Sequence, residues 1–224
     1  MAMEKFKASP LPRPTREYDE SYMMQFLRVI ELYFRQLDSQ TPLQADYFKG
    51  RGDKLWNPHI AYSDSTDQIA TGNNTPTIVK WDTLDTQFGW ALTAPGKAKA
   101  SYAGVYKMTY SLQLINTSNA IEYATVWLRV NGVDVPNSAT IFTVPARKNA
   151  TEFGYLAAYS EVTFSVDAGD EIELYWATNL AGNPTTPTDG VYIFHDVAQT
   201  TPFVRPAIPS AIGSITFVSA LGAL

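Results

Sequence analysis

YKMTYSLQL, residues 106–114, alternates strictly between large apolar or aromatic side chains and polar ones. Successive side chains of a β-strand point to opposite faces, so this segment predicts a strand with one buried face and one polar face. ATVWLRV, residues 124–130, repeats the alternation and runs directly into Asn131-Gly132. Asn-Gly at such a place favours a type I′ turn, because both central residues of that turn need positive φ. The sequence therefore predicts a β-hairpin near the middle of the chain.

The same period of two recurs over the rest of the chain from residue 55 onward. A second hairpin is expected where residues 162–166 and 172–176 flank the turn 167–170. Roughly ten short strands without a second helix predict a mainly β fold, a jelly-roll sandwich of antiparallel strands over residues 55–224. The remaining strands are expected near residues 60–63, 77–84, 88–92, 139–144, 151–159, 191–195 and 213–221.

The first 54 residues differ in character. Pro10, Pro12 and Pro14 alternate with other residues, and proline pushes its predecessor toward an extended conformation, which predicts an extended arm over residues 1–15. One amphipathic helix is expected over residues 16–39, followed by a linker over residues 40–54.

Two adjacent rows of apolar side chains run along this expected helix, one of them with the 4-3-4-3 spacing of a coiled coil. Such a helix either packs on the core of its own domain or self-associates in a helical bundle, and we favour the bundle because the sandwich looks complete without it. The expected bundle interface comprises Tyr22, Met23, Phe26, Leu27, Ile30, Tyr33, Phe34 and Leu37.

The composition excludes several classes of function. The chain has no cysteine, a formal net charge of -5 and only 17% charged residues, whereas about a quarter is usual. A sequence pI near 5.0 argues against a nucleic-acid-binding surface, which needs clustered Lys and Arg. The sequence shows neither the apolar run of a signal peptide nor one long enough to span a membrane, so we expect a protein that folds in a cytoplasm.

No catalytic constellation is evident. The chain has two histidines and none of the common nucleophile or phosphate-binding motifs. Ser214, His195 and Asp196 could form a Ser-His-Asp set only by chance, since nothing in the sequence specifies its geometry. The acidic turn 167–171 fits local turn hydrogen bonds better than calcium, which wants six to eight oxygen ligands. We therefore predict no enzyme activity, no catalytic residue, no cofactor and no metal site.

Four aromatic residues fall on strand positions opposite the core-facing ones. Large apolar side chains on the outer face of a sheet need a cover. Subunit contacts around a threefold axis or the chain's own long loops, such as residues 179–190, could supply it. We favour a trimer, because symmetric assembly also hides sheet edges. The expected sandwich trimer interface comprises Trp127, Tyr175, Tyr192 and Phe194.

Four segments carry a family resemblance in their order and spacing: KAKASYAGVY (97–106), WLRVNGV (127–133), VDAGDEIEL (166–174) and IGSITF (212–217). They resemble the complement globular-head family, which shares the jelly roll of tumour necrosis factor. The calcium and cysteine features of the vertebrate family have no equivalents here.

Further segments resemble versions of this domain in virion proteins of tailed bacteriophages, marine phages in particular: LPRP (11–14), LYFRQLD (32–38), AYSDSTDQ (61–68), DVPNS (134–138) and RPAIPS (205–210). This resemblance implies a homotrimeric virion component, made in the bacterial host cytoplasm, that decorates a capsid, forms a fibre or belongs to the tail. Its partners would be other virion proteins, with neither nucleic acid nor membrane, and Leu11, Pro12 and Pro14 would anchor it.

The alternative is a carbohydrate- or receptor-binding head of a host-recognition fibre. Sugar recognition would call for an exposed aromatic pocket near the loop 179–189. That loop is rich in Pro, Thr and Asn and contains no aromatic residue, which disfavours sugar stacking.

Overall fold

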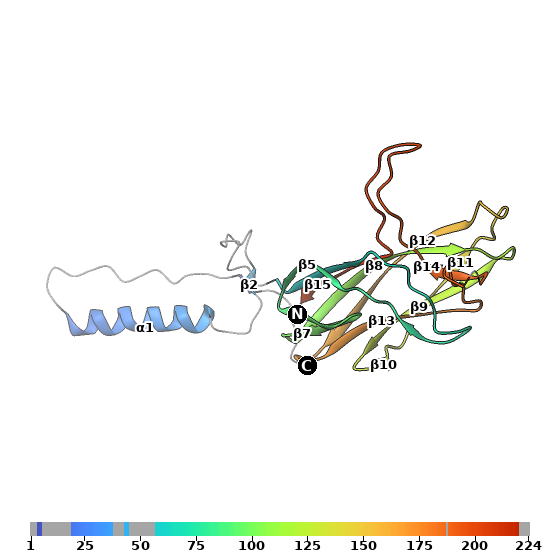
Figure 1. The fold of residues 1–224 in the computed structure, drawn as a ribbon. Coiled ribbons are helices and arrows are strands. Elements are labelled where there is room, and N and C mark those ends of the chain that lie inside the picture. Colours follow the sequence, from blue (N-terminus) through green and yellow to red (C-terminus); the bar gives the residue numbers. More distant parts are fainter. Residues whose placement is uncertain (1–3, 6–18, 38–42, 45–56, 187, 220–224) are drawn as a thin grey trace. The chain divides into compact units, whose positions relative to one another are not determined.

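A computed structural model describes residues 4–5, 19–37, 43–44, 57–186 and 188–219 of the chain (Figure 1). The chain divides into two compact units, Met1–Leu55 and Trp56–Leu224. The anchor residues predicted from the sequence, Leu11, Pro12 and Pro14, lie outside the described residues.

The first unit contains helix α1, which spans Glu20–Leu37. The helix begins after Asp19 because that side chain caps it: Asp19 Oδ1 accepts hydrogen bonds from the Ser21 backbone N at 2.9 Å and from Ser21 Oγ at 2.8 Å. These bonds lower the pKa of Asp19. The sequence placed the helix start near residue 16, before this cap. A short strand β1, Glu4–Lys5, pairs in parallel with β2, Leu43–Gln44.

The apolar rows of α1 are partly open. Tyr22 and Phe26 stack with ring centroids 6.2 Å apart, and Met23 and Ile30 are half-buried. Leu27 and Phe34 are exposed, as are Met24 and Leu32, which the sequence did not assign to the interface. The side chains of Tyr33 and Leu37 lie outside the described residues. The helical bundle stays a prediction.

The second unit is a sandwich of two antiparallel sheets (Figure 1). One sheet, called the β8 sheet here, has the strand order β12-β8-β15-β3-β5, and β14 also pairs with β8. Its strands are β3 (His59–Asp64), β5 (Thr83–Phe88), β8 (Gly104–Asn116), β12 (Gly154–Val166), β14 (Val191–Ile193) and β15 (Ala211–Ser219).

The other sheet, called the β9 sheet, has the order β10-β9-β13-β7-β6, with β11 on β9 and β4 on β13. Its strands are β4 (Thr77–Ile78), β6 (Trp90–Ala94), β7 (Lys97–Ala100), β9 (Glu122–Val130), β10 (Val133–Asp134), β11 (Thr140–Val144) and β13 (Glu171–Thr178). The predicted mainly β antiparallel sandwich with one N-terminal helix is thereby confirmed for the described part of the chain.

Three strand predictions need correction. The hairpin expected from residues 162–166 and 172–176 does not form, because β12 pairs with β8 in one sheet whereas β13 pairs with β9 and β7 in the other. The segments expected at 151–159 and 162–166 form one strand, β12, which begins only at Gly154 and pairs with β8 along its whole length. The expected strand 77–84 is interrupted after β4, since the side chain of Gln68 takes the place of a strand neighbour there. Gln68 Oε1 accepts from the Lys80 backbone N at 2.7 Å, and Gln68 Nε2 donates to the Lys80 carbonyl at 2.8 Å.

The core lies between the sheets and is dense in aromatic rings. Tyr62 stacks on Trp81 with ring centroids 4.3 Å apart, and Trp90 meets Tyr106 edge-to-face at 5.0 Å. Tyr62 on β3 lies directly across from Gly213 on β15. A Cβ atom at Gly213 would come within 2.1 Å of the Tyr62 ring, so only glycine fits under this ring without a shift.

Gly213→Ala is therefore expected to lower the free energy of unfolding by about 1–3 kcal/mol, the usual cost of overpacking a core. Chemical denaturation at a fixed protein concentration measures it. Thr143→Ala, at an exposed site on β11, is the control and should change stability by less than about 0.5 kcal/mol. Equal stability of the two variants would show that the Tyr62 ring can move aside.

Candidate functional site

The outer face of the β8 sheet, called the β8 face, carries side chains from alternate positions of its strands. In β12 these include Tyr155 and Tyr159, which are 55% and 61% exposed. The register places Tyr159 opposite Ser111 of β8, and Ser111 opposite Ile212 of β15. Exposed tyrosine and isoleucine side chains thus flank a line of small polar residues along β8.

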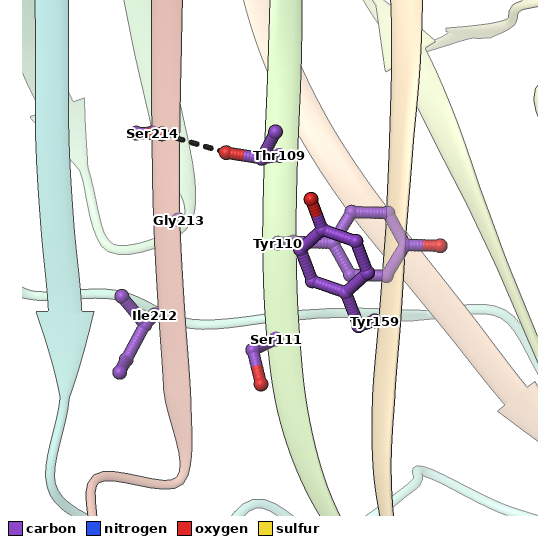
Figure 2. A pocket seen from close by; sticks show the side chains of 7 residues that line it. All are labelled: Thr109, Tyr110, Ser111, Tyr159, Ile212, Gly213 and Ser214. Atoms are coloured by element: carbon purple, nitrogen blue, oxygen red, sulfur yellow. Dashed lines mark hydrogen bonds between the residues drawn. The ribbon is translucent and has the colours of Figure 1, made fainter.

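A hollow of about 130 Å³ opens at this place (Figure 2). Thr109 Oγ1 and Ser214 Oγ are 2.7 Å apart at its edge, so the two hydroxyl groups satisfy each other. The lining contains no charged side chain: it consists of Thr109, Tyr110 and Ser111 of β8, Tyr159 of β12, and Ile212, Gly213 and Ser214 of β15. The hollow therefore has a wall of apolar character and no exposed charge that would oppose its burial.

Charged groups lie around this hollow rather than in it. Lys107 Nζ is 3.5 Å from Glu161 Oε2, and Asp85 accepts a hydrogen bond from Ser63 Oγ at 3.3 Å. An uncharged centre with a polar rim is the usual anatomy of a protein–protein interface.

β14 pairs with β8 in line with β15, so the β8 face continues along β8 beyond the end of β15. Tyr192 lies opposite Ile115 of β8 and is only 8% exposed. Burial raises the pKa of the Tyr192 hydroxyl, and the negative charge of Asp67 raises it further. Phe194 is half-buried, with its ring centroid 5.3 Å from that of Tyr155. Phe194 thus contacts Tyr155 of β12 on the β8 face.

On the outer face of the β9 sheet, called the β9 face, the side chains of Trp127 and Tyr175 are covered by the same subunit, whereas Tyr123 is exposed. Trp127 and Tyr175 are paired in register, with ring centroids 6.0 Å apart. The guanidinium group of Arg129 lies 3.9 Å from the Tyr175 ring centroid. Asp134 Oδ1 accepts hydrogen bonds from Trp127 Nε1 at 2.6 Å and from Arg129 Nε. Both hydrogen bonds lower the pKa of Asp134, and the one from Arg129 has the larger effect.

The β9 face also contains a nearly buried carboxylate with its own partner. Glu173 Oε1 is 2.7 Å from Lys97 Nζ, and the side chain of Glu173 is only 3% exposed. The hydrogen bond and the charge of Glu173 raise the pKa of Lys97. Stabilisation by this pair is complete below the usual lysine pKa and is lost as the pH rises through the raised value. The buried charge of Glu173 is thus neutralised within one subunit.

The four aromatic residues predicted as one trimer interface divide between these two faces. Trp127 and Tyr175 lie on the β9 face, whereas Tyr192 and Phe194 lie on the β8 face. Sequence reasoning missed Tyr155, Tyr159 and Ile212. The sequence does contain a signal for the two tyrosines. Their odd-numbered positions alternate with those of Phe164 and Val166, which face the core from the same strand, so both tyrosines must face outward.

The residues weighed for catalysis and calcium are engaged elsewhere. Ser214 bonds Thr109, while the Asp196 carboxylate bonds Arg205. Asp170 Oδ2 accepts from the Asp167 backbone N at 2.8 Å, in accord with turn chemistry. Among the described residues, no three His, Cys, Asp or Glu side chains are placed to hold a metal ion. In the same part of the chain, no helix combines the length and apolar character that crossing a bilayer requires.

Comparison with known proteins gives structural similarity only. No protein-family model matches the chain, and no curated protein does. The chain is similar to the crystal structure of murine APRIL at pH 8.5, with 13% sequence identity and a TM-score of 0.42, over 73% of this chain and 100% of that one. It is likewise similar to murine APRIL at pH 5.0, with 14% identity and a TM-score of 0.43, over 72% of this chain and 100% of that one.

Proposed function

We propose that this protein is a non-enzymatic structural component of a tailed-bacteriophage virion, a capsid decoration, fibre or tail-associated protein that assembles as a homotrimer. The observation that carries the assembly is the β8 face, with its uncharged hollow between exposed Tyr159 and Ile212. The threefold symmetry and the virion setting rest on the resemblance of the sequence segments quoted above.

The chemistry of the β8 face favours burial between copies. Tyrosine is enriched at interfaces because it adds large contact area with few rotatable bonds. Covering the exposed part of Ile212 contributes about 1 kcal/mol, and a closed ring repeats each such contact in every subunit. β12 lies at the end of the strand order in its sheet. An edge strand of this kind is a site for unwanted pairing, and assembly would protect it.

The β9 face supports the choice by contrast. The rings of Trp127 and Tyr175 are already covered by Arg129, and Glu173 is already paired with Lys97. Packing a second copy on that face would bury these charged groups, which is costly unless every one keeps its partner.

Tyr159→Asp is expected to convert the trimer into monomers, because it would bury three carboxylates in an uncharged interface. Sedimentation equilibrium at micromolar concentration measures the mass, which is 24.8 kDa for one chain. Tyr123→Asp is the matched control, since Tyr123 is 49% exposed on the β9 face and its variant should stay trimeric. A monomeric wild-type protein would refute the proposed assembly, and dissociation by the control alone would move it to the β9 face.

Attachment to the virion is assigned to the N-terminal arm. Extended proline-rich segments bind grooves of other proteins with little further loss of conformational entropy. Three arms held at one place by the helices would act together, because linked contacts raise one another's effective concentration.

Deleting residues 1–15 should therefore leave a folded, soluble trimer that no longer joins the virion. Mass spectrometry of purified particles assembled with the truncated protein should find it missing. Normal incorporation would show that the helix or the sandwich makes the attachment.

A second candidate function, binding of a host glycan, is favoured by a hollow of about 380 Å³ formed partly by the loop 179–189. The loop itself contains no aromatic residue, but Phe153 and Tyr192 reach the same hollow from other parts of the chain. Arg147 Nη2 is 3.3 Å from Asp189 Oδ2 there. Aromatic rings beside amide, hydroxyl and charged groups suit a saccharide. The lining residues are Thr117, Arg147, Ala150, Phe153, Asn183, Pro184, Thr188, Asp189 and Tyr192.

If this hollow binds a glycan, Phe153→Ala should weaken binding to purified host-cell polysaccharide about fivefold to tenfold, the equivalent of roughly 1 kcal/mol of ring contact. Biolayer interferometry with the immobilised polysaccharide measures this. Val133→Ala is the control and should bind as the wild type does, because Val133 is exposed at the end of β9 opposite to the one that meets the loop. Lack of binding by the wild-type protein would remove this candidate.

A further inference from the structure

A hairpin leaves the β8 sheet between β14 and β15. Phe194 N donates to the Gln113 carbonyl at 2.8 Å, and Ala211 pairs with Leu112. The chain therefore leaves β8 beside Gln113 and returns to it beside the neighbouring residue, Leu112. The intervening hairpin, residues 196–208, is held by bridges between Asp196 and Ile208 and between Gln199 and Arg205. Figure 1 shows it as an orange-red arm that stands away from the sandwich on the side of the β8 sheet.

The base of the hairpin is braced from within. Arg205 pairs with the Asp196 carboxylate, and its side chain is only 17% exposed. Arg205 Nη1 also donates to the Pro206 carbonyl at 3.1 Å, and Gln199 Nε2 donates to Asp196 Oδ2 at 3.1 Å. A segment ordered in this way before binding loses little conformational entropy when it binds.

The tip, by contrast, exposes apolar side chains. Phe203 is 64% exposed and Val204 is 82% exposed, and Val197, next to the base of the hairpin, is 63% exposed. The sequence from residue 197 to residue 204, VAQTTPFV, contains no charged residue. Exposed apolar side chains gathered on a projecting element mark a contact site.

We infer that the hairpin 196–208 is a clasp whose tip, Phe203 and Val204, packs on the β8 face of a second copy of this chain. This inference rests on the proposed self-association. The hairpin rises on the side of the β8 face, so a second copy that packs on this face in a threefold ring lies next to the hairpin (Figure 1). In its own subunit the tip is exposed and covers nothing.

Dimensions and chemistry fit this occupant. Seven residues of extended chain reach about 23 Å from Asp196 to Phe203, whereas the five strands of the β8 sheet span about 19 Å. The tip can therefore cross a neighbouring face. The uncharged hollow beside Tyr159 measures about 130 Å³, close to the roughly 150 Å³ of an apolar cavity that accepts benzene. The phenyl ring of Phe203 is the matching group.

A disulfide trap tests the contact, and the chain offers a clean background because it contains no cysteine. In the double variant Phe203→Cys/Tyr159→Cys, mild oxidation should link most chains into covalent dimers and trimers on a non-reducing denaturing gel, and reductant should reverse this. A bond within one chain would instead leave a band at the monomer mass. Val133→Cys/Tyr159→Cys is the control, since Val133 is 70% exposed on the other sheet, and it should link less than a tenth of the chains.

Phe203→Asp provides a second readout that needs no cysteine. It should weaken assembly at least tenfold by sedimentation equilibrium, while Val133→Asp should leave it unchanged. The clasp would be overturned if the Phe203→Asp variant assembles as tightly as the wild type and the double cysteine variant forms no covalent dimers or trimers. This holds even if Tyr159→Asp dissociates the trimer. A wild-type protein that is monomeric throughout would instead overturn the proposed self-association and the clasp with it.

Discussion

The alternation of side chains along β8 is the constraint on which the sandwich depends. β8 pairs with β12 over its full 13 residues on one side and with β15 and β14 on the other. A slip of one residue in either pairing would send Met108 and Leu112 to the outside and polar side chains into the core. The same register decides which side chains form the β8 face, so core and candidate interface are fixed together.

Much of the fold is predictable from local sequence. The Asn131-Gly132 turn is an example, because φ is 52° at Asn131 and 76° at Gly132, as a type I′ turn requires. The break after β4 could not be predicted, since the side chain of Gln68, twelve positions away in the sequence, holds the backbone of Lys80. Interactions of this kind depend on tertiary placement and leave no periodic signal.

The candidate site was only half predictable for a related reason. Parity identifies an outward-facing aromatic residue, but it does not say which of the two sheets the strand joins. Strand pairing places Trp127 and Tyr192 on opposite faces of the sandwich. Parity also cannot show that Arg129 already covers the aromatic rings of the β9 face. Tyr155 and Tyr159 could not be assigned to the outer face from the expected strand, because that strand ended at Tyr159. The core-facing residues Phe164 and Val166, which define the inward positions of β12, lie beyond that end.

The two outer faces thus differ at their centres: Trp127 and Tyr175 of the β9 face are covered by Arg129 within the subunit, whereas Tyr159 and Ile212 of the β8 face are exposed beside an uncharged hollow. A crystal structure of the purified full-length protein tests the resulting account most directly. The account predicts three copies around a threefold axis, with Tyr159 and Ile212 of each copy buried against the next. A structure in which both side chains face solvent, or in which the copies meet through Trp127 and Tyr175, would contradict it.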